Sequence, residues 1–392
     1  MDKKRFVYAD NAATTRVSDK VFAIMQPYFS NEFANPNSIY SFAHTARNAI
    51  EDARRKTTDA INAKNGNVYF TSGGTESDNW AITGVAAAES RKGKKHIIST
   101  KVEHYSVLNA LESLKKQGFE ITLLEADAEG MITPDQVEKA IREDTALVSV
   151  MYANNEIGTI YPIADIGAIC RKRNVLFHTD AVQAMGCVKI DVENQNIDLL
   201  TLSGHKFHAP KGIGCLYVRK GIALNNLIHG GGQEKGKRPG TENVPYITGF
   251  AEAVSIAANT VNERVEYVTN LRDKLLEGIL TIPGVKINGT MKQRLCGNIN
   301  VSLEAIEGES ILLALDMKGI FASSGSACTS GSLDPSHVLL AIGLPHALAH
   351  GSLRFTLNEE NTMEDVEYIL EHLPPIVQNL RNMSPLWREK GG

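Results

Sequence analysis

The chain has 392 residues and a nearly neutral balance of 41 Lys plus Arg against 45 Asp plus Glu. This length is more than one small module needs, and it predicts at least two lobes. The charge shows no basic excess of the kind that nucleic-acid binding requires, and a hydrophobic content of 43% indicates a globular protein with a sizeable core.

The first ten residues mix Asp2, Lys3, Lys4 and Arg5 with short apolar stretches. They lack the apolar segment of a secretory signal. No apolar run along the chain approaches the roughly 18 residues that span a bilayer. We therefore expect a cytoplasmic protein whose partners include neither a membrane nor nucleic acid.

Short β-rich runs alternate with helical stretches in the first half of the chain. Strands are expected at residues 68–70, 96–100, 119–124, 146–152, 175–178, 198–202 and 213–218, and helices at 76–88, 106–117, 134–142 and 163–173. Apolar strands separated by helices predict an α/β fold with a mostly parallel sheet that is covered on both faces. Ligands of such folds bind at the carboxyl ends of the strands.

The pattern changes after residue 240. A long helical region over 246–280, broken near Pro283 and Gly284, precedes two more strands at 298–303 and 352–357. Further helices lie between and after these strands. This second half predicts a smaller lobe of mixed helices and strands.

Residues 71–76, Thr-Ser-Gly-Gly-Thr-Glu, follow the first strand of the sheet and open a helix. The glycines allow backbone N–H groups to approach an anion, Thr75 offers a hydroxyl, and the helix N-terminus adds partial positive charge. The segment lacks the lysine of a P-loop and the three-glycine spacing of a dinucleotide site. An ordinary helix cap would explain the same residues.

Three more polar groups follow expected strands. Asp180 comes after the strand at 175–178, with Gln183 close behind it, although a lone Asp at such a point is often a helix cap. Lys206 comes after the strand at 198–202, beside the expected sheet edge, although lysines usually extend into solvent. The basic, glycine-rich segment 229–241 suits either an anion site or a mobile loop.

The five cysteines are an odd set without the close spacing of a zinc or iron–sulfur site, so we expect no disulfide framework and no intrinsic metal. Cys170 and Cys215 lie in apolar runs and are expected to be buried. Cys187 and Cys296 have no assigned role. Cys328 lies among small polar residues, a composition typical of an accessible loop, where the thiol is either functional or incidental.

An anion cradle, a carboxylate, a lysine and a thiol together suit a pyridoxal phosphate enzyme that acts on a sulfur-bearing amino acid. The lysine would form a Schiff base with the cofactor, and the carboxylate would keep the pyridine nitrogen protonated. The helix N-terminus would hold the phosphate. The residues taken alone leave this as one interpretation among several.

The chain resembles the cysteine desulfurases of the NifS/IscS kind, within the aspartate-aminotransferase-like fold of pyridoxal phosphate enzymes. The resemblance covers nearly the whole length and rests on residues 8–15, 152–158, 178–183, 203–206, 238–241 and 324–329. It implies a large cofactor-binding domain over 15–260. It also implies a small α+β domain, formed by 1–14 and 261–392, that carries Cys328 and Arg354.

The resemblance also implies the roles of the site residues. Lys206 carries the cofactor as a Schiff base, Asp180 pairs with the pyridinium, and His104 stacks on the ring and assists proton transfer. Cys328 is the catalytic thiol, and Arg354 binds the substrate carboxylate. The remaining implied site residues are Gly74, Thr75, Asn155, Gln183, Ser203 and His205 at the cofactor, Thr241 from the partner subunit of a homodimer with shared active sites, and Asn155 and Asn35 at the substrate.

The implied activity is the removal of sulfur from L-cysteine, which gives L-alanine and a persulfide on Cys328. The sulfur then passes to an iron–sulfur scaffold or to another acceptor protein. Since one cysteine cannot hold a cluster alone, Cys328 is at most a transient [2Fe–2S] ligand shared with such a scaffold. The alternatives are a selenocysteine lyase or another β-eliminating lyase on the same fold, and a non-catalytic iron–sulfur assembly partner.

Residues 35–40, Asn-Pro-Asn-Ser-Ile-Tyr, depart from the family pattern, in which Asn-Pro-Ser-Ser is followed by His. Tyr40 therefore replaces a polar group near the expected mouth of the active site. This difference concerns the approach of the substrate and leaves the implied chemistry intact.

Overall fold

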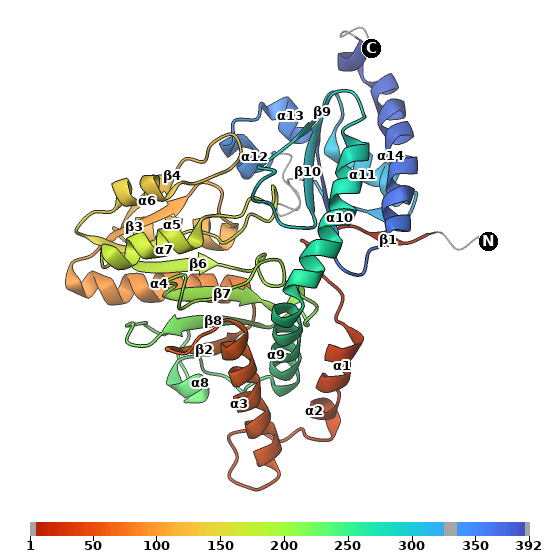
Figure 1. The fold of residues 1–392 in the computed structure, drawn as a ribbon. Coiled ribbons are helices and arrows are strands. Elements are labelled where there is room, and N and C mark those ends of the chain that lie inside the picture. Colours follow the sequence, from red (N-terminus) through yellow and green to blue (C-terminus); the bar gives the residue numbers. More distant parts are fainter. Residues whose placement is uncertain (1–4, 325–334, 389–392) are drawn as a thin grey trace.

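The computed structural model describes residues 5–324 and 335–388. Its largest sheet has seven strands in the order β2-β8-β7-β6-β5-β3-β4 (Figure 1). Only β8 runs antiparallel to its neighbours in this sheet, and the other pairings are parallel, which confirms the predicted mostly parallel sheet. The strands are β2 (Gly66–Thr71), β3 (His96–Thr100), β4 (Glu120–Leu124), β5 (Thr145–Ser149), β6 (Leu176–Asp180), β7 (Leu199–Ser203) and β8 (Gly214–Arg219).

Helices cover both faces of this sheet. Every residue of β3, β5 and β7 is buried, as expected for strands with a helix layer on each side. Helices α4 (Gly74–Glu89) and α5 (Tyr105–Lys116) pack on one face through a cluster that includes Trp80 and Leu111. A second cluster on the other face draws on α3 (Ala43–Ala60), α6 (Pro134–Ala140), α7 (Ile163–Lys172) and α9 (Val244–Asn259).

A smaller three-stranded antiparallel sheet has the order β12-β10-β9. Its strands are β9 (Val285–Ile287), β10 (Asn298–Leu303) and β12 (Ser352–Thr356). A separate hydrophobic core packs this sheet against α10 (Val261–Ile279), α11 (Gly308–Asp316) and α14 (Met363–Met383). We call this part the smaller lobe and the part around the seven-stranded sheet the larger lobe.

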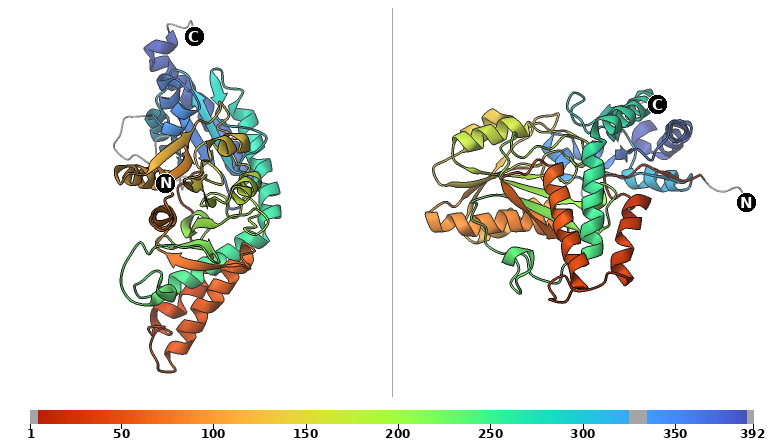
Figure 2. Two further views of the ribbon diagram at one scale, coloured as in Figure 1. Left: turned by 90° about the vertical axis from the view of Figure 1, so that its left-hand side faces the viewer. Right: turned by 60° about the horizontal axis from the view of Figure 1, so that its bottom comes forward.

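The two lobes are joined at several points. Helices α9 and α10 run one after the other along both lobes, divided at Thr260 inside the helical region predicted over 246–280 (Figure 2). The N-terminal strand β1 (Val7–Tyr8) pairs with β11 (Ile320–Phe321) of the smaller lobe. Helices α12 (His337–Ala341) and α13 (His346–His350) contribute residues to the core of the larger lobe, so the chain after residue 261 serves both cores. The domain boundaries at 15 and 260 stay a prediction.

The remaining helices are short. They are α1 (Asp19–Met25), α2 (Pro27–Ser30), α8 (Gln233–Gly236) and α15 (Pro385–Arg388), with 3-10 turns η1 (Ser90–Lys92) and η2 (Gly204–Lys206). Within the described residues, no helix combines the length and the apolar character that a membrane crossing demands. Cys170 and Cys215 are buried, as predicted.

Candidate active site

A cavity of about 630 Å³ lies where the carboxyl ends of β6 and β7 meet the start of α4. Most of the sequence-predicted site residues line it. They are Gly74, Thr75, His104, Asn155, Asp180, Gln183, Ser203, His205, Lys206 and Arg354. Cys328 lies outside the described residues. The topology therefore brings together groups that are up to 280 residues apart in the sequence, between Gly74 and Arg354.

Two predicted site residues do not line this cavity. Asn35 and Thr241 are both exposed on the surface of the chain. Their segments lie next to each other, because the side-chain amide of Asn37 donates a hydrogen bond of 2.7 Å to the carboxylate of Glu242. The structure thus places Asn35 and Thr241 in one surface region rather than in the site of their own chain.

The start of α4 forms an open cradle at one end of the cavity. The N-cap is Gly73, and it provides no side chain to pair with the first N–H groups of the helix. A Cβ atom at Gly74 would lie 2.9 Å from Val182 Cγ2 and 3.4 Å from Ser203 Cβ. The absence of side chains at these glycines leaves helix N–H groups accessible to an anion.

Lys206 and Asp180 lie at the ends of two adjacent parallel strands. Lys206 sits in η2, directly after β7, and its Nζ donates to the carbonyl oxygens of Ala12 (2.6 Å) and Ala13 (2.8 Å). Gln183 Nε2 donates to the same Ala12 carbonyl at 3.0 Å. The backbone near the N-terminus therefore closes this side of the cavity, a role that the sequence did not indicate.

Asp180 is the last residue of β6 and is buried. Its Oδ1 accepts a hydrogen bond of 2.9 Å from the Val182 N–H. Burial raises the pKa of Asp180, while the nearby His104 and Lys206 lower it. A cation placed against this carboxylate would be strongly favoured, because it would compensate for the lost hydration of the negative charge.

His104 is held by a short chain of hydrogen bonds at the start of α5. Its Nδ1 accepts the Ser106 backbone N–H at 3.1 Å and lies 2.8 Å from Ser106 Oγ. Ser106 Oγ donates in turn to Asp78 at 2.6 Å. Burial lowers the pKa of His104, which favours the neutral imidazole. Because Nδ1 accepts the backbone N–H, the neutral ring carries its proton on Nε2.

Asp78, at the far end of this chain, is almost completely buried. Burial raises its pKa well above the ordinary value, and the charge of Asp180 acts in the same direction. Neither Asp78 nor Ser106 was predicted from the sequence. The signal that could have found Asp78 is its position one helical turn after Thr75, on a helix whose start faces the cavity.

Arg354 marks the opposite end of the cavity, on β12. Its guanidinium donates to the Asn155 carbonyl at 3.0 Å and to Asp10 Oδ1 at 2.9 Å. The Nε of this buried side chain has no hydrogen-bond partner among the described residues. A buried arginine with an unused donor is suited to a carboxylate ligand. Burial raises the pKa of Asp10, and the Arg354 charge opposes that rise.

Two further groups complete the electrostatics of the region. Burial lowers the pKa of His205 to about 4, and Lys206 and Lys211 act in the same direction, so this imidazole is neutral at pH 7. Burial raises the pKa of Glu156 to about 7 although Ser336 and Arg354 oppose the rise. Ser336 donates a hydrogen bond to Glu156, and this contact anchors the chain after residue 334 beside the Arg354 end of the cavity.

The glycine-rich segment 229–241 is fixed to the larger lobe by two ion pairs. Glu234 is buried and accepts two hydrogen bonds from Arg54, at 2.8 and 2.9 Å, and one from the Phe70 N–H at 2.9 Å. Arg238 donates to Glu76 at 2.8 Å. These contacts hold the segment in place and so argue against a mobile loop, and Arg238 is paired with a carboxylate of the protein itself, which does not favour an anion site.

Comparisons with known proteins agree with this geometry. Residues 7–369 match the aminotransferase class-V family. The chain is 54% identical over 384 residues to a cysteine desulfurase IscS of Methanosarcina thermophila, which covers 98% of this chain and 95% of the relative. A solved NifS-like protein has a TM-score of 0.89 at 37% identity and covers 96% of this chain and 100% of that chain. The structure of SspA in complex with cysteine has a TM-score of 0.78 at 38% identity, and the match covers 90% of this chain and 98% of that chain.

Proposed function

Because the chain belongs to the class V aminotransferases and, among them, to the cysteine desulfurases, we propose that it uses pyridoxal phosphate on Lys206 to take sulfur from L-cysteine and passes this sulfur on through Cys328. The family resemblance and the fold expected from it are thereby confirmed. One observation carries the proposal: Lys206, Asp180 and the start of α4, where no side chain caps the helix, line a single cavity.

The donor set of this cavity fits pyridoxal phosphate. The N–H groups around Gly74 and the hydroxyls of Thr75 and Ser203 suit its phosphate, and Asp180 suits its pyridinium. Lys206 offers the amine that would carry it. When bound, the cofactor supplies an electron sink for the negative charge that develops at the substrate Cα.

Arg354, Lys206 and His104 would each have a separate role in the reaction. Arg354 would bind the substrate carboxylate, with the Asn155 side chain near the same end of the cavity. Lys206 Nζ would move the proton at the substrate Cα, since this amine already points into the cavity. His104 would exchange a proton at Nε2, because its Nδ1 is occupied by the Ser106 N–H.

The sulfur transfer itself falls to Cys328, which lies outside the described residues. Its thiolate would attack the substrate sulfur, so that an S–S bond forms while the Cβ–S bond breaks. The electron pair of the broken bond stays with Cβ, which takes a proton and leaves as part of L-alanine. The product on the protein is a persulfide on Cys328, ready for an acceptor.

L-cysteine as the substrate is supported by the solved relative in complex with cysteine. We also propose that the acceptor is a protein, either an iron–sulfur scaffold or another thiolation protein, and that the reaction takes place in the cytoplasm. The core of the smaller lobe draws on Val7, Ala9 and residues 268–377, which supports our proposed division into a domain over 15–260 and a domain formed by 1–14 and 261–392, although α12 and α13 pack into the core of the larger lobe.

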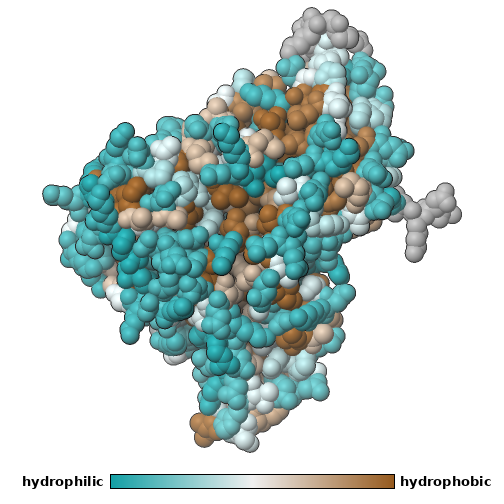
Figure 3. All heavy atoms as spheres, viewed as in Figure 1, coloured by the Kyte–Doolittle hydropathy of each residue, from teal (hydrophilic) through white to brown (hydrophobic). Residues whose placement is uncertain are grey.

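A homodimer with shared active sites is supported by an exposed apolar surface. Phe22, Phe29, Phe33, Ile39 and Phe42 are between 43% and 95% exposed, on α1, on α2 and in the loop before α3. Figure 3 shows apolar side chains at this lower end of the molecule. An exposed patch of this kind is typical of a protein–protein interface.

In such a dimer, Asn35 and Thr241 could contribute to the active site of the partner subunit. Neither residue lines the cavity of its own chain, and a hydrogen bond from Asn37 to Glu242 holds their two segments together. We expect the dimer to bring Thr241 to the phosphate end of the partner's cavity, and Asn35 to accompany it.

The experiment that tests the proposed function is the Lys206→Ala substitution. We expect the visible absorbance of the lysine-bound cofactor and the turnover of L-cysteine to be lost. Lys115→Ala is the control, because Lys115 is exposed on α5 and lies outside the cavity, and it should leave the absorbance and the turnover unchanged. Turnover of L-cysteine by Lys206→Ala at the rate of the unchanged chain would contradict the assignment.

A further inference from the structure

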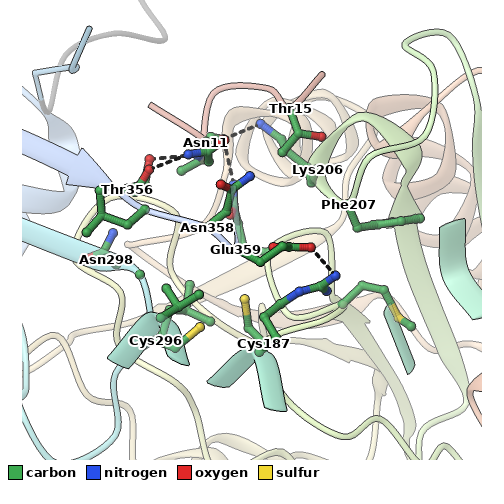
Figure 4. Close-up of a pocket in the computed structure, with 18 of the residues that line it drawn as sticks. Asn11, Thr15, Cys187, Lys206, Phe207, Cys296, Asn298, Thr356, Asn358 and Glu359 are labelled. Atoms are coloured by element: carbon green, nitrogen blue, oxygen red, sulfur yellow. Dashed lines mark hydrogen bonds and ion pairs between the residues drawn. The ribbon is translucent and has the colours of Figure 1, made fainter. Parts of the chain in front are cut away.

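Two cysteines without a role in the proposed reaction meet at the boundary between the lobes. Cys187 lies on the segment that continues from Asp180 and Gln183, and Cys296 lies just before β10. Both line a second cavity, which also reaches Lys206 (Figure 4). Cys187 packs against the hydrophobic cluster to which Cys296 belongs, and Figure 4 shows both sulfur atoms at the same cavity.

The packing around the pair comes from both lobes. Cys187 belongs to the larger lobe but packs, half-buried, against the core of the smaller lobe, and Cys296 is part of that core with 5% of its surface exposed. Backbone turns fix both positions: the Cys187 N–H donates to the Ala184 carbonyl at 2.9 Å, and the Asn298 N–H donates to the Leu295 carbonyl at 3.2 Å. The pair of thiols therefore lies at the interface between the lobes.

The charges around the pair make the two thiols unequal. The neighbouring Cys187 thiol lowers the pKa of Cys296 although burial opposes this, and Arg264 and Arg272 act in the same direction as Cys187. The neighbouring Cys296 and burial raise the pKa of Cys187. Because the thiolate is the reactive form, Cys296 would react first and Cys187 would respond to it.

We propose that Cys187 and Cys296 are a site of reversible disulfide formation that joins the two lobes, with a small hydroperoxide as the oxidant. The Cys296 thiolate attacks a peroxide oxygen, the O–O bond breaks, and a sulfenic acid forms on Cys296. The Cys187 sulfur then displaces the hydroxyl group, which leaves as water. With hydrogen peroxide, the two thiols lose two electrons and two protons in total, and the peroxide becomes two waters.

The disulfide would connect the two ends of the active-site cavity. Cys187 continues the segment that carries Asp180 and Gln183, and Cys296 leads into β10, which pairs in register with β12 at Asn300 and Arg354. Oxidation would therefore fix the spacing between the Asp180 end and the Arg354 end. A dithiol reductant would release it.

The test uses the holoenzyme of Cys328→Ala, so that the proposed catalytic thiol does not consume the oxidant. After treatment with hydrogen peroxide, a peptide map made without reduction should contain the Cys187–Cys296 linked peptide, and dithiothreitol should remove it. This map requires no substitution in the pair itself and does not depend on desulfurase activity. A sulfinic acid on Cys296 without the link, an unoxidised pair, or equal linking to Cys170 or Cys215 would overturn the proposal.

A second measurement tests the connection between the lobes. In Cys328→Ala, oxidation should raise the midpoint of thermal unfolding, and dithiothreitol should reverse the rise. The rise should be absent when Cys187→Ser is added, and it should persist when the matched control Cys170→Ser is added, since Cys170 is buried in the larger lobe. A rise of equal size with Cys187→Ser would contradict the proposed link.

Discussion

The hydroxyl of Ser106 connects the imidazole of His104 to the buried carboxylate of Asp78. Ser106 Oγ lies 2.8 Å from His104 Nδ1 and 2.6 Å from Asp78 Oδ2. When the imidazole is protonated, its Nδ1–H can donate a hydrogen bond to this hydroxyl oxygen. We therefore regard Ser106 as a positioning residue for His104.

Ser106→Ala should lower kcat/KM for L-cysteine about tenfold. Without Oγ the protonated imidazole loses an acceptor, so the pKa of His104 should fall further. The acid limb of the kcat/KM profile should then move to lower pH. Ser106→Thr retains the hydroxyl and should retain the profile, and Ser113→Ala, on an exposed position of the same helix, should change nothing. An unshifted acid limb in Ser106→Ala would show that Ser106 serves only packing.

The buried Glu156 predicts a pH dependence of stability. Its pKa is raised from 4.5 to about 7 by burial, so the unfolded chain releases this proton at lower pH than the folded chain. The contribution of Glu156 is therefore complete below about pH 4.5 and is lost as the pH rises through about 7, a loss of about 3 kcal/mol.

Glu156→Gln does not titrate and should remove this part of the pH dependence. Urea unfolding of the substituted chain should show a smaller loss of stability between pH 5 and pH 8 than the unchanged chain shows. Glu129→Gln, on an exposed position, is the control and should leave the dependence as it was. Equal dependence in Glu156→Gln and the unchanged chain would contradict the assignment.

Individual site residues could be predicted from the sequence where they directly follow a predicted strand. Lys206 and Asp180 follow apolar strands, and the fold rule places such residues at one edge of the sheet. Asp10, Ser106 and the Ala12 carbonyl were not predictable, because their partners are brought to them only by the tertiary fold. The proximity of Cys187 and Cys296 was missed for the same reason.

At the scale of elements, a buried ion pair ties α8 to α3 and β2. Both carboxylate oxygens of Glu234 are bonded to Arg54, and Phe70 donates its N–H to the same group. Glu234→Gln would leave the buried Arg54 charge with only the exposed Glu51, 3.5 Å from its Nε, as a counterion. Loss of one partner of a buried pair typically costs about 3 to 5 kcal/mol.

Denaturant unfolding should show this loss in Glu234→Gln. The control is Arg142→Gln, which breaks a pair with the exposed Glu120 and should leave the unfolding midpoint within experimental error. Equal, small effects of the two substitutions would contradict the structural importance of the buried pair. A large effect would also explain how the segment leading to Thr241 keeps its position.

The elements of the sheet were predictable because each strand is a short apolar run between helical stretches. The direction of β8 was not predictable, since its residues are as buried as those of its parallel neighbours and a buried strand shows no alternation. The segment 229–241 was open to two interpretations, because composition does not reveal that Glu234 is a buried anchor.

At the scale of the whole molecule, the exposed position of Thr241 predicts active sites that are completed by the partner subunit. Lys206→Ala and Thr241→Ala should each be weakly active or inactive alone. After unfolding and refolding together, half of the dimers should be mixed, and each mixed dimer should contain one site with Lys206 from one chain and Thr241 from the other. Turnover of about a quarter of the value for the unchanged protein is then expected.

The control for this experiment is the refolding of each variant by itself, which should give no such recovery. Recovery with a mixture of Lys206→Ala and Asp180→Ala should also fail, because both residues line the cavity of the same chain. If the Lys206→Ala and Thr241→Ala mixture recovered no activity, Thr241 would act within its own chain or not at all.

The two lobes could be predicted from the change of pattern after residue 240. The packing of α12 and α13 against the core of the larger lobe could not, because short amphipathic helices give no indication of which core they join. The cavity depends on this long-range assembly, since its residues come from both lobes. The fold rule connected Asp180 and Lys206 at one edge of the sheet, and the family resemblance added Arg354 of the smaller lobe.

The central claim is that sulfur leaves L-cysteine as a persulfide on Cys328. Its most direct test is the mass of the holoenzyme and of its Cys328 peptide after one equivalent of L-cysteine is added without an acceptor. We predict one added sulfur atom on Cys328 and one L-alanine released per active site, with neither formed by Cys328→Ala. Alanine formed while the Cys328 peptide gains no sulfur, or sulfide released by Cys328→Ala at the full rate, would contradict the account.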